Sequence, residues 1–486
     1  MESVKPKPKT KEKKRKPAVE KYLRGSKPES KGLYDKKLRA RIQADEKLNQ
    51  EVAKRDAWRE LLMPEEAGFV EAEGGLEKTY KFQQKDITTA VDVASARKHF
   101  NLSLEDFGPY QLDYSRDGRH LLLGGRKGHV ALMDWQSHKL ECEFHLNETL
   151  RCLRFLHVHN MFAVAQKENV YIYDNEGTEM HRLQQHKHVT SMEFLPYHFL
   201  LATGSTDGHL RYMDTSIGKL VADHNVRLGR LSCMTQNPHS AVIHLGHQNG
   251  VVSLWTPNSG KPQVQMLCHR GAVGDVAIDR SGTYMVTSGV DCLLKVWDLR
   301  TYKQLHFYRT PQPARSISIS QRGLLAAGCN TDVRIWRDGL SSKASSTYLQ
   351  HHFTGLHINE AQFCPYEDVI GIGHSGGFSS LLVPGAGEAN FDALEHNPFQ
   401  TKRQKQEKEV KQLLEKLPPD LITLDTTAVH QIAKADTEDL DELHERDHFK
   451  PRHRTKGKSS AANRFRRIQA VRDRERRDRI RKSSKK

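Results

Sequence analysis

Residues 287–298 have the sequence TSGVDCLLKVWD, in which two short apolar runs flank a turn. Alternation of apolar and polar residues over roughly four to eight positions is typical of a strand with one buried face. Asp291 lies between the runs, and its carboxylate can accept a hydrogen bond from the backbone just ahead of it, as in tight turns. A single hairpin cannot bury its own apolar face, so the pattern predicts a repeat.

The pattern recurs when Trp297 is taken as the reference position. The equivalent residues are Met133, Tyr173, Met213, Trp255, Trp297, Trp336 and Leu382. They are separated by 40, 40, 42, 42, 39 and 46 residues, close to the roughly 40–45 residues of a WD-type propeller blade. An aspartate follows the reference position at Asp134, Asp174, Asp214 and Asp298, where turn chemistry explains it. We therefore predict an all-β fold, a seven-bladed WD40-type β-propeller at about residues 106–385, with helical or disordered basic extensions.

The composition restricts the compartment and the class of protein. No apolar run approaches the ~20 residues that cross a bilayer, so we expect no membrane partner. The lysine-rich start has no apolar core and does not predict a secretory signal. The seven cysteines form no CxxC pair, which indicates buried thiols in a reducing compartment rather than disulfides or a zinc site.

The formal charge of +16 is concentrated at the two ends of the chain. Residues 1–50 sum to +10, residues 450–486 sum to +14, and the residues between them sum to −8. Basic tails on a mildly acidic body indicate that the tails contact a polyanion while the body has another role.

Charge runs and turn residues divide the chain into six expected parts. These are a disordered basic tail (1–32), a helix (33–63), a linker (64–105), the propeller (106–385), a C-terminal segment (386–448) with a helix at 402–417, and an arginine-rich arm (449–486). The linker alternates like a strand at residues 79–84. We expect this stretch to close the ring as the outer strand of the last blade, because closure removes exposed sheet edges.

Three groups of residues are candidates for contact with partners. The nuclear-import or RNA-contact candidates are Lys13, Lys14, Arg15 and Lys16, for which a solubilising tail is the alternative. The RNA-contact candidates in the arm are Arg464, Phe465, Arg466, Arg467, Arg472, Arg474, Arg476, Arg477, Arg479 and Arg481. Arginine can grip phosphate bidentately and stack on bases, although a solvated helix with internal ion pairs would show the same pattern. The protein-docking candidates, at helical spacing before Pro418, are Val410, Leu413, Leu414 and Leu417.

The sequence contains no signature of catalysis. GIGHSG at 371–376 matches GxGxxG, but a strand-like run rather than a helix follows it, so the match predicts a turn. The 27 histidines show no convergent ligand spacing, and we expect His186 to be a structural residue that bonds across its blade. We therefore expect no catalytic residue, cofactor, metal or small-molecule substrate.

The chain also resembles a known family. GAGEANFDALE at 385–395, NPFQTK at 397–402 and LLEKLPP at 413–419 resemble the C-terminal domain of a nucleolar WD-repeat family, the U-three-associated, BING-four-type proteins of the small-subunit processome. EAEG at 71–74, EKTY at 77–80 and FGPY at 107–110 resemble the region before its propeller, so the resemblance covers roughly 60–460.

This resemblance implies a non-enzymatic scaffold in the nucleolus that is required for pre-ribosomal RNA processing and maturation of the 18S RNA. The implied partners are other processome proteins, including another WD-repeat protein, and pre-ribosomal or small nucleolar RNA bound through the basic tails. The alternative is a substrate-receptor propeller of a cullin-type ubiquitin ligase, because residues 297–300 read WDLR and match a WDxR docking motif.

Overall fold

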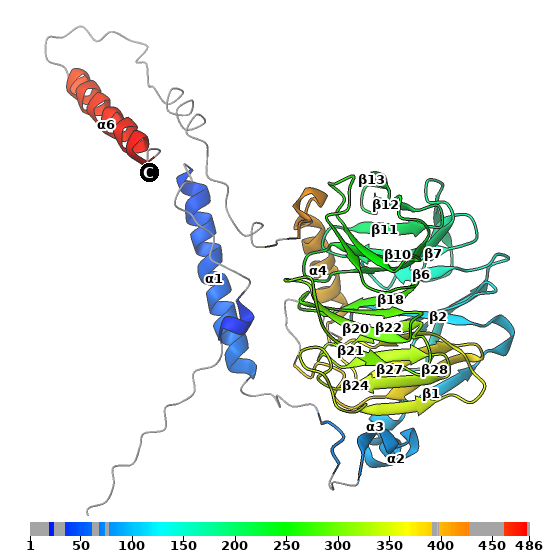
Figure 1. The fold of residues 1–486 in the computed structure, drawn as a ribbon. Helices are drawn as coiled ribbons and strands as arrows, with labels where there is room; N and C mark the ends of the chain where they lie inside the picture. The colour runs from blue at the N-terminus through cyan, green and yellow to red at the C-terminus, as the bar shows by residue number, and fades with distance from the viewer. Residues whose placement is uncertain are drawn as a thin grey trace, which may run out of the picture. The chain divides into compact units, whose positions relative to one another are not determined.

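The computed structural model describes residues 19–23, 35–60, 68–72, 77–390, 396, 398–424, 426 and 461–483, without the side chains at 20–21, 59–60, 461–464 and 480–483. The chain divides into two units. One comprises residues 60–426 and holds every strand of the described chain, and the other joins residues 1–59 with residues 427–486 (Figure 1).

Seven four-stranded antiparallel sheets form the larger unit, and their first strands contact one another in a closed ring. From the centre outwards, the first strands are β2 (Tyr110–Tyr114), β6 (Cys152–Phe155), β10 (Val189–Leu195), β14 (Leu231–Gln236), β18 (Val273–Ile278), β22 (Ser316–Ile319) and β26 (Ile358–Phe363). The second strands are β3 (His120–Gly125), β7 (Met161–Ala165), β11 (Leu200–Ser205), β15 (Ile243–His247), β19 (Tyr284–Gly289), β23 (Leu325–Cys329) and β27 (Val369–His374). The third strands are β4 (His129–Asp134), β8 (Val170–Asp174), β12 (His209–Asp214), β16 (Val251–Trp255), β20 (Leu293–Asp298), β24 (Asp332–Trp336) and β28 (Gly377–Leu382). The outer strands are β5 (Lys139–His145), β9 (Glu179–Leu183), β13 (Lys219–Asn225), β17 (Val264–Leu267), β21 (Lys303–Arg309), β25 (Leu349–His352) and β1 (Phe100–Ser103). The prediction of a seven-bladed propeller is confirmed.

The reference residues of the repeat occupy one register position in all seven blades. Each lies in the third strand of its blade and pairs with the second strand, as Met285 pairs with Trp297 and Val369 with Leu382. Leu382, the least typical member, therefore belongs to the series. In the GxGxxG match, residues 371–374 belong to β27 and residues 375–376 form the turn before β28. The prediction that a strand follows the match is confirmed, whereas the turn itself takes in only its last two residues.

Polar residues link the strands within a blade. In blade five, Trp297 Nε1 donates to Thr287 Oγ1 at 3.0 Å, and the ring of His269 bridges Thr287 Oγ1 at 2.9 Å and Asp291 Oδ1 at 3.0 Å. A buried polar group is stable only when it has such partners. His186 makes the expected bond across its blade, to Thr203 Oγ1 at 2.7 Å. The seven cysteines are free, and five of them are buried, as predicted.

The turns divide the propeller into two faces. In an antiparallel blade, the turns from the first to the second strand and from the third to the fourth lie at one end of the strands. We call this end face A. Face B carries the turns from the second to the third strand and the connections between blades.

The segment before the first blade closes the ring, as predicted. The closing strand is not at residues 79–84, so that part of the prediction is wrong. Residues Thr79–Lys81 form the 3₁₀ turn η2, and the helices α2 (Gln84–Ala90) and α3 (Val93–Ala96) follow it. The side chain of Gln83 and that of Asp86 form a capping box, which starts α2 and excludes a strand there.

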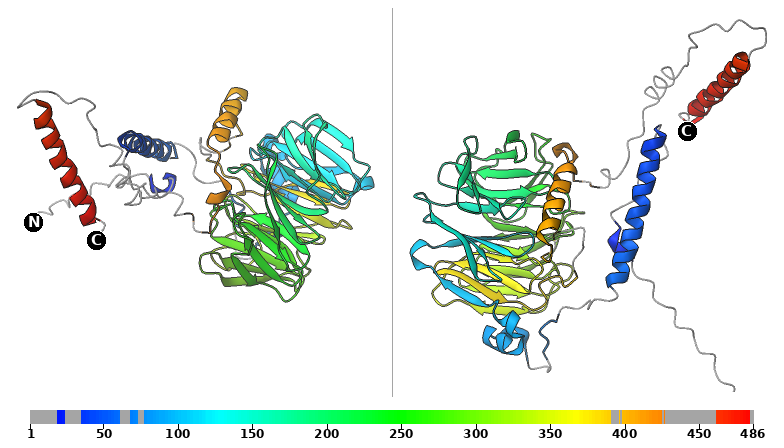
Figure 2. Two further views of the ribbon diagram at one scale, coloured as in Figure 1. Left: turned by 90° about the horizontal axis from the view of Figure 1, so that it is seen from above. Right: turned by 180° about the vertical axis from the view of Figure 1, so that it is seen from behind.

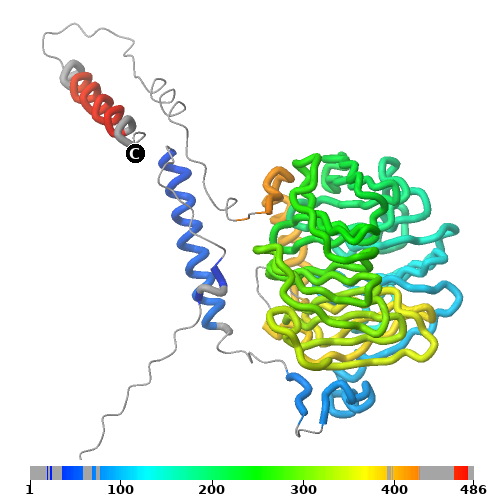
Figure 3. Tube along the Cα trace, in the orientation of Figure 1, coloured from blue at the N-terminus to red at the C-terminus, as the bar shows by residue number. Residues whose placement is uncertain are grey.

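The closing strand is β1, which pairs antiparallel with β28 from Phe100↔Ser380 to Ser103↔Gly377. Gln84 secures the same edge, because its side chain donates to the Leu382 carbonyl at 3.0 Å and accepts from the Leu382 N–H at 2.9 Å. Figure 3 shows the trace of this unit from the blue N-terminal segment to the orange C-terminal one.

The second unit contains α1 (Lys36–Glu60) except its last residue, together with α6 (Ala461–Ser483) and the short η1 (Val19–Tyr22). The first helix lies within the stretch predicted as helical at 33–63, and α6 lies within the arginine-rich arm. Among the described residues, no helix is both long and apolar enough to cross a membrane.

Candidate docking site

The chain continues from the last blade onto face A, where the sequence predicts that it leaves the propeller. We call the described part of residues 386–424 the C-terminal segment. Ala386 is buried with the apolar core of the last blade, and the Gly387 N–H donates to Asp368 Oδ1 at 2.8 Å. The next residue, Glu388, approaches Arg280 of blade five at 3.8 Å. The segment therefore begins as a part of the propeller surface.

The helix α4 (Lys402–Leu414) forms the centre of the C-terminal segment (Figure 2). Thr401 Oγ1 accepts the Gln404 N–H at 3.4 Å, and Gln404 Oε1 accepts the Thr401 N–H at 3.0 Å. This capping box satisfies two of the free donors of the first turn. Pro418 and Pro419 exclude a longer helix, so α4 ends close to the predicted position.

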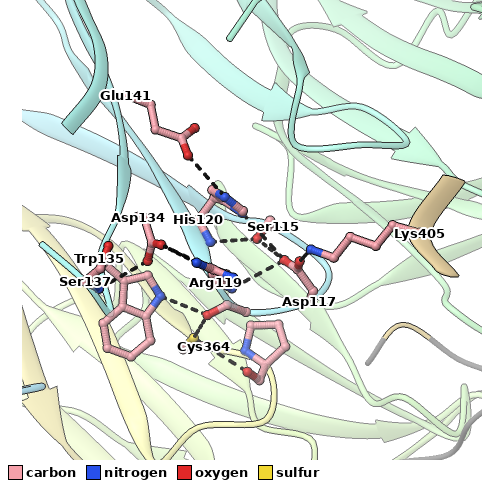
Figure 4. Close-up of polar contacts among 12 residues, drawn as sticks. Ser115, Asp117, Arg119, His120, Asp134, Trp135, Ser137, Glu141, Cys364 and Lys405 are labelled. Atoms are coloured by element: carbon pink, nitrogen blue, oxygen red, sulfur yellow. Dashed lines mark hydrogen bonds and ion pairs between the residues drawn. The ribbon is translucent and has the colours of Figure 1, made fainter. Parts of the chain in front are cut away.

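Asp117, in the turn between β2 and β3, holds the N-terminal half of α4 (Figure 4). Its carboxylate accepts hydrogen bonds from Ser115 Oγ at 2.5 Å and from Lys405 Nζ at 2.8 Å. Burial alone would raise the pKa of Asp117, but the His120 side chain and the bonds from Lys405 and Ser115 lower it well below its usual range. Asp117 is therefore a charged, buried anchor for the helix.

The turn around Asp117 is itself held in place, as Figure 4 shows. Its Gly118 carbonyl accepts from Trp135 Nε1 at 2.9 Å and from the Cys364 thiol at 3.3 Å. Arg119 forms an ion pair with Asp134 at 3.0 Å. Blades one and seven both fix this turn, so contacts other than the one with Lys405 also hold Asp117 in position.

A second buried ion pair, between Lys416 and Asp214, holds the other end of α4 on blade three. Burial acts to raise the pKa of Asp214, but hydrogen bonds from Lys416 and Ser216 lower it overall. One residue later, the Leu417 N–H donates to the Tyr197 carbonyl at 3.0 Å. The two ion pairs thus lie at opposite ends of the helix.

The C-terminal segment ends in the apolar core of the middle blades. Ile422 is 1% exposed and belongs to a cluster that includes Trp255 and Leu299. Asn258 donates to the Asp420 carbonyl at 2.8 Å beside it. Burial of an aliphatic side chain of this size contributes roughly 1.5–3 kcal/mol.

A cavity of about 330 Å³ lies between α4 and the turns of blades one and two. His157 meets Glu409 at 3.2 Å in its wall. Burial, followed by the charge of neighbouring groups, lowers the pKa of His159 to about 4 and that of His396 to about 3. Both imidazoles are therefore neutral near pH 7.

Polar residues of α4 face the propeller, whereas its apolar residues face away. Lys405, Glu409 and Gln412, at helical spacing, touch the propeller or line the cavity. The predicted docking residues are between 37% and 82% exposed: Val410, Leu413, Leu414 and Leu417. Contact with the propeller thus leaves an apolar stripe on the outer side of the helix.

The basic candidates lie elsewhere. Every arginine of α6 with a described side chain is exposed, and Phe465 is exposed as well. The side chains of Arg464 and Arg481, and all of Lys13, Lys14, Arg15 and Lys16, lie outside the described residues. Their roles in RNA contact or import stay predictions.

The structure also brings together three side chains that the sequence pattern does not connect. Donor atoms of His129, Glu143 and His145 lie within 4.8 Å of one another. However, both ring nitrogens of His129 already have partners, Tyr110 Oη at 3.0 Å and Glu143 Oε1 at 2.9 Å. The described contacts thus account for this cluster as a link between β2, β4 and β5.

The sequence pattern does not single out the residues of face A that hold α4. Asp117 is a polar residue in a turn, and Asp214 follows a reference position as other aspartates do. Their partners, Lys405 and Lys416, lie 288 and 202 residues further along the chain. No local signal connects charges so distant in sequence.

Comparison with known proteins gives matches to both parts of this arrangement. The BING4CT (NUC141) domain matches residues 347–425, from before β25 through the C-terminal segment. The WD domain, G-beta repeat, matches residues 177–214 and 260–298. Blade seven and the C-terminal segment therefore form one sequence domain, in agreement with their contacts.

Similar proteins cover most of the chain. WD repeat-containing protein 46 of Homo sapiens is 48% identical over 478 residues, which are 96% of this chain and 78% of that protein. The protein of the same name from Mus musculus is 49% identical over 463 residues, or 92% of this chain and 74% of that protein. U3 small nucleolar RNA-associated protein 7 of Saccharomyces cerevisiae is 45% identical over 429 residues, or 85% and 77%.

Proposed function

The chain belongs to the family of WD repeat-containing protein 46 and U3 small nucleolar RNA-associated protein 7, and from this premise we propose that it is a nucleolar scaffold of the small-subunit processome. In this proposal it supports pre-ribosomal RNA processing and maturation of the 18S RNA without catalysing a reaction. The name of the yeast relative, which refers to U3 small nucleolar RNA, supports a role in ribosome biogenesis. The propeller supports a scaffold because it is a rigid body with two faces and an outer rim.

The outward apolar stripe of α4 is the observation that carries the scaffold proposal. A helix that packs on its own domain normally turns apolar residues inward. Here, buried ion pairs hold the helix, and its leucines remain exposed. Val410, Leu413 and Leu414 occupy positions i, i+3 and i+4 of the helix, and Leu417 follows three residues after its end; an apolar surface of this kind fits the groove of a partner protein. We therefore propose that another processome protein docks on this stripe.

The L413D/L414D variant tests this docking. Leu413 and Leu414 are 43% and 82% exposed, so the thermal midpoint is expected to change little, whereas co-sedimentation with pre-ribosomal particles is lost. The matched control is R403D/K411D, which places two aspartates at exposed polar positions of the same helix. Retention of L413D/L414D on the particles would exclude the stripe as the docking surface.

RNA contact through α6 is proposed separately. The arginines at 472, 474, 476, 477 and 479 carry guanidinium groups that can bind phosphate, and all five side chains are exposed on α6. Replacement of these five by glutamine in the full chain is expected to weaken RNA binding and to flatten its dependence on salt, by about 0.7 in the logarithmic slope for each lost contact with a single strand. An unchanged slope would assign the affinity to another part of the chain.

Purification of the tagged chain distinguishes the scaffold from the ligase receptor. The scaffold predicts association with pre-ribosomal particles. Residues 297–300 form the end of β20 and the start of the following turn, and the Arg300 side chain is exposed there. Capture of a cullin adaptor that requires Arg300, without particles, would support the ligase alternative instead.

A further inference from the structure

The mouth of the central channel on face B contains a cup of about 320 Å³. Six blades contribute to its wall, which includes Arg126, Arg151, Arg230 and Arg315. Thr190 and Asn359 add uncharged hydrogen-bonding groups. Arg126 comes from the turn between β3 and β4, and the others come from the connections between blades and from first strands, so the propeller fold itself brings the four cations to one place.

Irregularities in the first strands aim several of these side chains at the channel mouth. The register shifts between Val189 and Ser191, which leaves Thr190 unpaired, and the same shift in β26 leaves Asn359 unpaired. The Arg151 N–H donates to the Ala165 carbonyl at 2.9 Å although Cys152 is the residue paired with Ala165. Arg151 and Cys152 thus both lie opposite Ala165, as in a β-bulge. A bulge changes the direction in which a side chain points.

Blade six repeats the arrangement of blade two. The Arg315 N–H donates to the Gly328 carbonyl at 2.9 Å, while Ser316 is paired with Gly328. Arginine therefore occupies the same structural position in two blades across the ring.

The arginines of the cup have no charged partner among the described residues, in contrast to the arginine below them. Arg151 Nη1 is buried and has no hydrogen-bond partner within that part of the chain. Three residues further along β6, about 10 Å deeper, Arg154 bonds Asp113 at 2.9 Å and also bonds Glu193. An unpartnered buried donor destabilises a protein by roughly 1–3 kcal/mol, more when it is charged. The cup thus retains cationic donors that a ligand can satisfy.

Carboxyl groups line the channel below the cup, so an anionic ligand would bind at the rim of the channel, where the arginines lie. Glu360 accepts the Leu112 N–H at 3.2 Å, and Asp275 accepts the Ile317 N–H at 2.7 Å. These carboxylates lie beside Arg154, below the cup. Burial raises the pKa of Glu360 and of Asp275 to about 7, so both carboxyl groups are only partly ionised near neutral pH. Deeper in the channel an anion would meet these carboxyl groups and an arginine already bonded to Asp113 and Glu193, so its charged group is held by the unpartnered arginines of the rim.

We propose that face B binds an acidic peptide of a partner protein, with one carboxylate or phosphorylated side chain in the cup. Arginine is the side chain that holds both groups bidentately, and the four cations of the cup include no lysine. The volume suits one side chain and excludes a nucleic-acid duplex. Among the described lining residues there is no aromatic ring, so the cup lacks the stacking surface on which single-stranded RNA is bound.

Fluorescence anisotropy with the full-length chain tests the proposal. The probes are labelled deca-glutamate, a phosphoserine decapeptide, deca-glutamine and deca-uridine RNA. R151Q/R315Q is expected to weaken binding of an acidic probe at least tenfold, and the more affected probe identifies the carboxylate or the phosphate as the preferred group. The matched control is R300Q/R309Q, which removes the same charge from exposed sites outside the cup and is expected to change affinity less than twofold.

The basic tails also attract anions, but they are identical in all variants, so only the differences between variants are interpreted. R126Q/R230Q, at exposed positions of the cup, provides a second test if R151Q/R315Q unfolds. Equal effects of the cup and control variants, or no effect of either cup variant, would overturn the proposal. A loss of RNA binding as large as that of the acidic probes would make the cup a nucleic-acid site instead.

Discussion

The two faces of the propeller differ in whether their charges have partners within the chain. On face A, Asp117 and Asp214 are buried, and each forms an ion pair with a lysine of the C-terminal segment. On face B, Arg151 and Arg315 point into a cup without an acidic partner among the described residues. The difference indicates that the C-terminal segment of the chain itself binds face A, whereas the cup on face B is available to a separate molecule.

The largest expected effect on stability lies where face A is covered. Ile422→Ala removes a side chain buried among blade residues, and we expect it to lower the free energy of unfolding by about 2–5 kcal/mol. If the C-terminal segment detaches alone, hydrogen exchange at residues 417–422 accelerates instead. Leu421→Ala, at a neighbouring site that is 39% exposed, is the control and should cost less than about 1 kcal/mol. Equal effects of the two variants would show that the segment is not anchored in the core.

A smaller decrease in the free energy of unfolding is expected when the charge of Asp117 is removed. Asp117→Asn leaves Lys405 without its anion, at a cost of about 1–3 kcal/mol in chemical denaturation. Because folding lowers the pKa of Asp117, its contribution is full above the ordinary aspartate pKa and is lost as acidification approaches the folded value. The difference between wild type and variant should therefore vanish in strong acid. Asp207→Asn, at an exposed turn on face B, should stay within about 0.5 kcal/mol of wild type.

The cavity beneath α4 predicts a further loss of stability in mild acid. Burial keeps His159 and His396 neutral, with pKa values of about 4 and about 3 against an ordinary 6.5. The unfolded chain takes up these protons first, so stability should fall as the pH drops from about 6.5 towards 4. His159→Gln should flatten this part of the pH profile measured by thermal unfolding. If the slope is unchanged in the variant, His159 does not contribute to it.

The smallest effect is expected on face B. R151A/R315A removes two cations that stabilise no described contact, so the unfolding midpoint should fall by no more than the equivalent of about 0.5 kcal/mol, and relief of the unpartnered Arg151 donor acts to raise it. A destabilisation comparable with that of Ile422→Ala would mean that the arginines are structural. Such a result would remove the distinction between the two faces.

The sequence predicts the blades because each one repeats the same local chemistry. Trp297, Asp298 and the turn at Asp291 recur in register, and they act within a single hairpin. Ring closure could not be located in the same way. The closing strand β1 is four residues long, and its partner Ser380 lies 280 positions after Phe100. The alternation at 79–84 resembles a strand more closely than residues 100–103 do. However, the capping box at Gln83 stabilises the start of a helix at Gln84.

The sequence predicts which residues form the apolar stripe of the docking site. It does not predict which side of α4 faces the propeller. The spacing of Val410, Leu413, Leu414 and Leu417 identifies an apolar stripe whichever way the helix faces. The ion pairs with Asp117 and Asp214 determine the orientation, and they join residues from distant parts of the chain. The bulges that aim Arg151 and Arg315 likewise depend on pairing between strands, which no short window of sequence records.

The joining of β1 to β28 has a consequence for synthesis. A ribosome that adds roughly 5–20 residues per second emits the first of these strands tens of seconds before the second. Throughout that interval the growing polypeptide presents an unpaired edge to the surrounding cytoplasm, where chaperones can shield it. A product that ends before Gly377 never acquires β28, so incomplete copies keep this open edge and differ by it from finished ones.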